Sequence, residues 1–195
     1  ALEAELAQGL LAHLEQGKPA RTFPMAPAER ELAQSWFLLT TKPVLYAANI
    51  AEDALDKPEA EIPGLLRMRE IAAREQAELL VISARIEEEI ARMPPEDKAE
   101  FLAALGLAQS GLDRLVTSCY RLLGLISFLT VGADECRAWT VQAGTKAPQA
   151  AGKIHTDLER GFIRAEVVPF ETLAAQGSMA ACRERGVWPF SHFNR

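Results

Sequence analysis

The sequence lacks any apolar run of the roughly 20 residues that a helix needs to cross a bilayer. Its first ten residues, ALEAELAQGL, contain two glutamates where a secretory signal requires a basic end and an apolar core. These features disfavour membrane and secretory roles, and we expect a cytoplasmic protein without a membrane partner.

Cysteine and histidine are scarce as well. The three cysteines, at positions 119, 136 and 182, show no CxxC spacing, which favours free thiols in a reducing compartment. The histidines, at positions 13, 155 and 192, are isolated and have no zinc spacing, so no metal site is predicted. For His155 a structural, hydrogen-bonding role is favoured over catalysis. No Ser–His–Asp or Cys–His pattern is indicated.

An excess of positive charge is also absent, since the 195 residues carry a formal net charge of −6. This argues against a chain that coats nucleic acid over its whole surface, although a local basic patch remains compatible with it. With 49% hydrophobic and 25% charged residues, the chain can form a sizeable core in one domain or two small ones. The acidic run Glu87 to Glu89 predicts a solvated helix face, because consecutive helical residues point about 100° apart.

Leucines four positions apart predict one face of an amphipathic helix over residues 2–16. A proline-rich linker and a second helix from Pro27 follow. The inward-facing residues of that second helix are predicted to be Leu32, Trp36 and Leu39.

Two short apolar segments, KPVLYAAN (42–49) and AELLVISAR (77–85), are typical of buried strands. Alternation of such strands with helices implies parallel pairing within an α/β layer. The helices are predicted at 62–76, 87–93, 94–107 and 110–125. The inward-facing residues of the last one are predicted to be Leu112, Leu115, Val116, Cys119 and Leu122.

The pattern changes near Gly124, where we place a domain boundary. Two strands joined by a turn around 132–134, then a helix and a further strand, follow the order of a β-grasp fold. These elements are predicted at 125–132, 135–144, 147–158 and 161–170. In the last strand, the inward-facing positions are predicted to be Phe162, Ala165 and Val167.

Several segments together resemble one family. They are LLTTKPVLYAANIAED, LLVISARIEEEI, GLDRLVTSCYRLLGLISFLT and RAWTVQAGTKAPQAAGKIHTDLERGFIRAEVV. They resemble the YchF or Obg-like ATPases, which are P-loop NTPases related to translation factors. The resemblance covers residues 6–176. It implies an α/β fold: the C-terminal part of a Ras-like P-loop NTPase domain with a helical insertion, followed by a β-grasp (TGS) domain.

The resemblance implies three regions, with two departures from the family pattern. Residues 1–40 correspond to the end of the helical insertion, 41–124 to the later segment of the nucleotide-binding domain, and 125–195 to the TGS-like domain. The phosphate-binding motif GxxxxGK[ST] does not occur in the sequence. The end, GVWPFSHFNR, differs from the family's closing strands. We therefore expect the later part of such a protein, with a TGS domain incomplete at its end.

Asn49, Ile50 and Glu52 match the positions of the NKxD motif with which Ras-like GTPases bind guanine. The resemblance implies that they contact the base of a nucleotide. Glu52 is one methylene longer than Asp and Ile50 replaces a Lys, so guanine-specific hydrogen bonds are weakened and ATP becomes acceptable beside GTP. From the spacing alone, Asn49 ends a strand and Glu52 begins a helix, and this alternative stays open.

Ser83, Ala84 and Arg85 match the family's second base-binding loop. The resemblance implies that Ser83 supports the turn, the amide of Ala84 contacts the base, and Arg85 covers the ring with its guanidinium. The alternative is a strand end at which Ser83 caps a helix. Mg²⁺ and the catalytic residues of ATP or GTP hydrolysis are expected outside this sequence.

Four cations in the TGS-like region are candidate contacts to RNA or the ribosome. They are Lys146, Lys153, Arg160 and Arg164. The alternative, scattered solubilising charges, is equally compatible with the spacing. The resemblance thus implies an ATP- or GTP-hydrolysing enzyme linked to the ribosome, with a monomer favoured; a non-catalytic RNA- or ribosome-binding module is the alternative.

Overall fold

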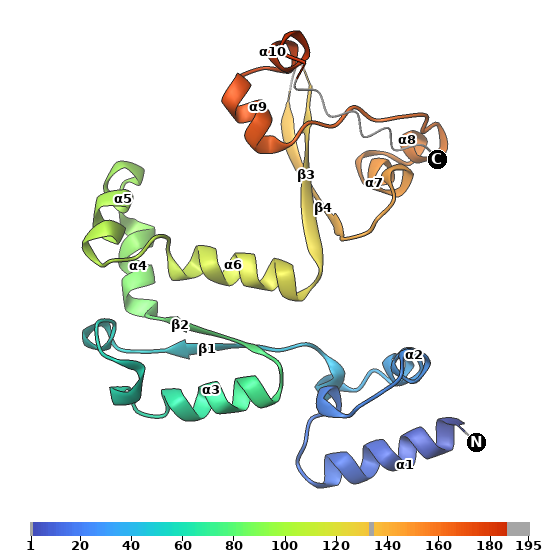
Figure 1. The fold of residues 1–195 in the computed structure, drawn as a ribbon, viewed down its shortest axis with the longest axis vertical. Coiled ribbons are helices and arrows are strands. Elements are labelled where there is room, and N and C mark those ends of the chain that lie inside the picture. The colour runs from blue at the N-terminus through green and yellow to red at the C-terminus, as the bar shows by residue number, and fades with distance from the viewer. Residues whose placement is uncertain (1, 133–134, 187–195) are drawn as a thin grey trace. The chain divides into compact units, whose positions relative to one another are not determined.

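The computed structural model describes residues 2–132 and 135–186 and divides into two compact units (Figure 1). Unit 1 extends to Leu123 and unit 2 begins at Gly124. Among the described residues, no helix combines the length and apolarity that crossing a membrane requires. The predicted limits of the three sequence regions stay a prediction.

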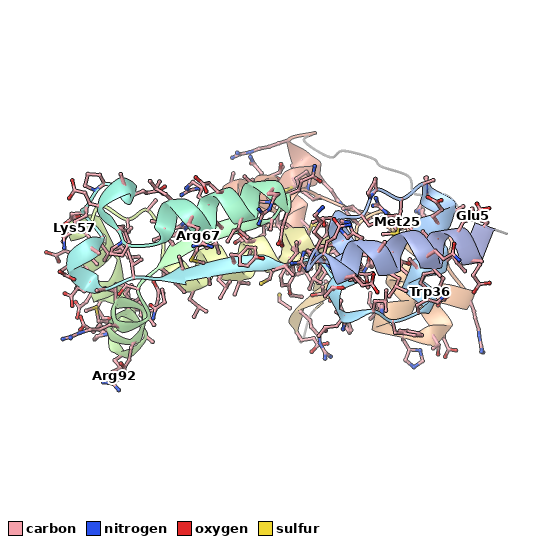
Figure 2. The ribbon with its side chains drawn as sticks, turned by 90° about the horizontal axis from the view of Figure 1, so that it is seen from below. Glu5, Met25, Trp36, Lys57, Arg67 and Arg92 are labelled. Carbon is pink, nitrogen blue, oxygen red and sulfur yellow. The ribbon has the colours of Figure 1, made fainter. Side chains whose placement is uncertain are left out.

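Unit 1 begins with two packed helices. They are α1 (Leu2–Glu15) and α2 (Pro27–Ser35). The short 3₁₀ helix η1 (Ala20–Thr22) follows α1, and η2 (Leu39–Thr41) follows α2. Their core consists of Leu6, Leu10, Ala20 and Ala33. Met25 and Trp36 pack against this core, and Figure 2 shows both of them beside α1.

The prediction that Leu39 faces inward is wrong, because its side chain is 77% exposed. The chain turns at Phe37, whose φ of 51° lies in the left-handed region that few non-glycine residues adopt. After this turn Leu38 packs against the helical core in place of Leu39.

The predicted parallel pairing is confirmed. Strand β1 (Leu45–Asn49) pairs in parallel with β2 (Glu78–Ile82), in a register that sets Asn49 opposite Ile82. Helix α3 (Leu65–Arg74) makes the crossover, preceded by η3 (Glu52–Ala54) and η4 (Glu59–Glu61). The strands are only partly covered, since Ala48 and Leu80 are their buried residues.

Three helices complete unit 1: α4 (Ala84–Arg92), α5 (Pro95–Ala104) and α6 (Gly111–Leu122). The predicted inward face of α6 is wrong in two positions, because Leu112 is 56% and Val116 50% exposed. The helix packs on β2 through the face that carries Leu115, Ser118 and Leu122, where the buried Ser118 hydroxyl donates a 2.8 Å hydrogen bond to Oε1 of Glu78.

Unit 2 opens with a β-hairpin, as predicted. Strand β3 (Leu125–Val131) pairs antiparallel with β4 (Cys136–Gln142). Helices α7 (Ala147–Ile154), α8 (Thr156–Arg160), α9 (Phe170–Gln176) and α10 (Met179–Glu184) follow. The predicted helix over 147–158 is interrupted at His155, whose Nδ1 accepts the Asp157 amide at the start of α8.

The predicted strand over 161–170 is wrong. Residues 162–169 belong to no helix or strand, and β3 and β4 are the strands of unit 2 among the described residues. An extended segment becomes a strand only when its amides and carbonyls pair with a neighbour. Val167, predicted to face inward, is 44% exposed. The β-grasp order is therefore not seen in residues 124–132 and 135–186, and the altered closing strand expected at 187–195 lies outside the described residues.

Candidate functional site

A cavity of about 550 Å³ opens where β1 and β2 end, at the carboxyl edge of the parallel pair. This edge is where open α/β sheets bind ligands, because the loops that leave the strands diverge there. The lining residues are Asn49, Ile50, Ala51, Glu52, Asp53, Ser83 and Arg85. All but Ala51 and Asp53 were predicted as site residues, and the two segments that carry them are 30 positions apart in sequence.

Asn49 joins the two loops of the cavity. Its side-chain Oδ1 accepts a 2.9 Å hydrogen bond from the backbone N–H of Ala84. The backbone N–H of Ile50 donates to the carbonyl of Ile82 at 2.9 Å, which extends the strand pairing by one residue. Ala84 does not line the cavity, and its amide is held by Asn49. The amide nitrogen of Asn49 has no hydrogen-bond partner among the described residues, and it can donate to a ligand.

The hydroxyl of Ser83 is buried and has no hydrogen-bond partner among the described residues. Ser83 occupies the position before α4, but its side chain makes no capping hydrogen bond, which is the interaction expected from the helix-cap alternative. The residue is 3% exposed and lines the cavity. An unsatisfied buried hydroxyl costs about 1–3 kcal/mol, so a ligand or a water that reaches it gains that interaction.

Glu52 and Arg85 form an ion pair at the mouth of the cavity. Arg85 Nε lies 3.4 Å from Oε2 of Glu52 and 3.6 Å from Oε1 of Glu89. The Arg85 side chain is 75% exposed, so this surface pair contributes only about 0–1 kcal/mol and can open at small cost. The Arg85 side chain can therefore change its conformation at small cost.

Glu87 was missed by the sequence analysis. It is half-buried, and its carboxylate accepts the backbone N–H groups of Gly111 and Leu112 at the start of α6, at 2.7 and 3.0 Å. The prediction of a solvated acidic face is therefore wrong for Glu87. Its partners lie 24 and 25 positions away, and no local pattern in the sequence indicates such a contact.

The four cations predicted to contact RNA all lie on unit 2 and are exposed. Lys146 precedes α7, Lys153 lies in its last turn, and Arg160 ends α8. Arg164 lines a second cavity, of about 490 Å³, with Leu158 and Phe162. Within the described parts of the chain, none of the four cations has an ion-pair partner.

Residues 2–132 and 135–186 contain no group of three His, Cys, Asp or Glu side chains placed to hold a metal ion. The residues of the first cavity therefore do not fit Mg²⁺ on their own. The unsatisfied Ser83 hydroxyl and the free amide nitrogen of Asn49 are hydrogen-bonding groups available to a polar ligand.

The family model YchF-GTPase_C, described as a protein of unknown function, matches residues 125–192. A ribosome-binding ATPase YchF of Bacillus subtilis is 46% identical over 184 residues, which are 94% of this chain and 50% of that relative. An Obg-like ATPase 1 of Oryza sativa is 37% identical over 95% of this chain and 46% of that relative.

A solved structure, the YchF GTPase of Schizosaccharomyces pombe, superposes with a TM-score of 0.80 at 30% identity. The match covers 98% of this chain and 51% of the yeast protein. The chain thus spans about half the length of the relatives it matches. Similarity in both sequence and structure along almost all of its length shows that this chain belongs to the family of YchF and Obg-like ATPases.

Proposed function

We propose that the cavity at the end of β1 and β2 binds the base of a nucleotide, with Asn49, Ile50, Glu52, Ser83 and Arg85 around the ring. The observation that carries this proposal is the buried, unsatisfied hydroxyl of Ser83, a residue that lines the cavity. Ile50 offers an apolar surface to one side of the ring. Ala84 acts indirectly, because its amide fixes Asn49.

Adenine fits the polar groups of the cavity better than guanine does. The Asn49 amide nitrogen donates to N7, and the second lone pair of Oδ1 accepts from the N6 amino group, which is the bidentate pairing of Asn with adenine. The Glu52 carboxylate is displaced by one methylene from the Asp position of a guanine site, and Arg85 already engages it. ATP is therefore the proposed nucleotide, with GTP as the weaker alternative.

The complete protein is proposed to hydrolyse ATP by transferring the γ-phosphoryl group to water, in a cytoplasmic role at the ribosome. Support comes from the relatives, whose names describe ribosome-binding ATPases. Such catalysis rests on positioning and on charge neutralisation by Mg²⁺ and a phosphate loop. The sequence contains no GxxxxGK[ST] motif, so the 195-residue chain alone is expected to show no ATP turnover.

NMR titration of the 195-residue chain with adenosine and with guanosine tests the base site. Adenosine is expected to shift the amide signals of Asn49, Ile50 and Ser83 at lower concentration than guanosine. Ser83→Ala, which removes the unsatisfied hydroxyl, should weaken adenosine binding about fivefold. Ser35→Ala, an exposed serine of α2, is the matched control. The proposal would be contradicted if adenosine shifted none of these three amide signals, or if Ser83→Ala bound adenosine as tightly as the wild type.

A second candidate function, an RNA- or ribosome-binding module, is favoured by the unpaired cations of unit 2. The cavity beside Arg164 adds an apolar and aromatic wall, formed by Leu158, Ile163 and Phe162, on which an unpaired base can stack.

Ribosome co-sedimentation at two salt concentrations tests this module. Replacing Lys146, Lys153, Arg160 and Arg164 by Gln should weaken binding and reduce its salt dependence. The matched control replaces four exposed cations of unit 1, Lys18, Arg30, Lys42 and Arg67, and therefore changes the net charge equally. An equal loss of ribosome binding in both variants would show that only net charge matters and would contradict the proposed module.

A further inference from the structure

Glu87 connects the second loop of the cavity to the start of α6. Its backbone N–H donates to the carbonyl of Ser83 at 3.0 Å and so closes the first turn of α4. Its carboxylate reaches across to the amides of Gly111 and Leu112. One residue therefore holds Ser83 through its backbone and α6 through its side chain.

The contact is closely fitted. A Cβ added to Gly111 would lie 2.8 Å from Oε1 of Glu87 and 2.9 Å from Cγ2 of Ile82. Ile82 is the last residue of β2, and its carbonyl accepts the amide of Ile50. The first residue of α6 thus lies against both Glu87 and the strand end from which the cavity opens.

The N–H groups of the first three residues of α6 all have side-chain acceptors in this arrangement. A helix leaves its first four N–H groups without intrahelical partners. Glu87 accepts those of Gly111 and Leu112, and the Ser110 hydroxyl accepts that of Asp113 at 3.0 Å. The N–H of Arg114 makes the first ordinary helical hydrogen bond, to the carbonyl of Ser110 at 3.2 Å. A carboxylate at this end is further stabilised by the helix dipole.

We propose that Glu87 is a positioning residue of the base cavity. By anchoring the first turn of α4 to α6, it holds Ser83 against the cavity and keeps the amide of Ala84 within reach of Asn49. This inference rests on the proposed base-binding function, and it assigns to Glu87 a role in affinity besides its contribution to stability.

Three variants of the 195-residue chain test the role of Glu87. Glu87→Ala removes both acceptors, and Glu87→Gln keeps one oxygen but turns an N–H group toward the second amide. Gly111→Ala keeps the Glu87 side chain but crowds both its carboxylate and Cγ2 of Ile82. Glu88→Ala is the matched control, because Glu88 is exposed and its one ion-pair partner among the described residues is Arg92, one turn along the same helix.

Adenosine affinity by NMR is measured at a temperature at which each variant is fully folded, together with hydrogen exchange of the Ala84 amide. We expect Glu87→Ala and Gly111→Ala to weaken adenosine binding at least about threefold and to speed Ala84 exchange about tenfold. Glu87→Gln should fall between them and the wild type, and Glu88→Ala should match the wild type.

A merely structural cap predicts a different result: lower melting temperatures with adenosine affinity and Ala84 exchange unchanged in the folded variants. That result would overturn the proposal. If Glu87→Ala does not fold, Glu87→Gln and Gly111→Ala decide the question. If the wild type binds no adenosine, the base-binding function fails, whereas Ala84 exchange still decides whether Glu87 holds the loop.

Discussion

The pair formed by Arg21 and Glu75 joins the N-terminal helices of unit 1 to its α/β layer, and its removal gives a sharp test of the fold. Oε2 of Glu75 accepts hydrogen bonds from Nε and Nη2 of Arg21 at 3.2 and 2.5 Å, and from the Tyr46 hydroxyl at 2.8 Å. Nη1 of Arg21 also donates to the carbonyl of Thr40 at 3.4 Å. Glu75→Gln retains an acceptor oxygen but removes the charge.

The size of the effect follows from burial. The side chains of Arg21 and Glu75 are 18% and 10% exposed. Water therefore solvates the charge of Arg21 poorly once the charge of Glu75 is removed. A hydrogen bond to a charged group contributes about 1.5–3 kcal/mol, and breaking a buried pair costs about 3–5 kcal/mol. Because Gln keeps weaker versions of these bonds, we expect Glu75→Gln to lower the free energy of unfolding of unit 1 by about 2 kcal/mol.

Urea unfolding followed by circular dichroism measures this change. With a slope near 2 kcal/mol/M, the midpoint should fall by about 1 M. A double-mutant cycle with Arg21→Met should give a coupling of at least about 1 kcal/mol. The matched control is the cycle between Lys57 and Asp53, an ion pair whose side chains are 46% and 78% exposed, which should give well under about 1 kcal/mol. Equal couplings in the two cycles would refute the reasoning from burial.

Three further predictions concern pH, the cavity and α6. The hydrogen bond from Arg21 holds the pKa of the Glu75 carboxyl below its ordinary value of 4.5, against the opposing effect of burial. The stabilisation that the ionised Glu75 contributes is therefore complete above about pH 4.5 and is lost as the pH falls through the lowered pKa. In urea unfolding at a series of acidic pH values, the difference in unfolding free energy between wild type and Glu75→Gln should shrink below pH 4.5. Asn49→Ala removes the acceptor of the Ala84 amide and should speed hydrogen exchange at that amide, measured by NMR, whereas unchanged exchange would contradict the hydrogen bond. Ser110→Ala removes the side-chain cap of α6 and should cost about 1 kcal/mol of unfolding free energy in urea, with a loss below about 0.3 kcal/mol counting against it.

The elements that local pattern determines were predicted well. The two parallel strands and the hairpin of β3 and β4 were located because their apolar segments are short and bounded by turn residues. The helix starting at Pro27 was located because a proline-rich linker precedes it and glutamates in its first turn suit the helix dipole. In each case the signal lies within about ten residues of the element itself.

Contacts between distant segments were not predictable in the same way. Glu75 meets Arg21 across 54 positions, and Glu87 meets Gly111 across 24. The predicted strand at 161–170 was wrong for a related reason, because its composition suits a strand but no neighbour pairs with its backbone in the described chain. The base site was proposed from family resemblance, and the unsatisfied hydroxyl of Ser83 is visible only in three dimensions.

The capping of α6 by Glu87 has an electrostatic consequence. The start of a helix attracts anions, and many proteins use such an end to hold phosphate. In this chain the carboxylate of Glu87 already occupies that position on the first two amides of α6. Inorganic phosphate or sulfate therefore meets a filled and negatively charged site there, and the helix that begins at Gly111 contributes its favourable end to folding rather than to the binding of an anion.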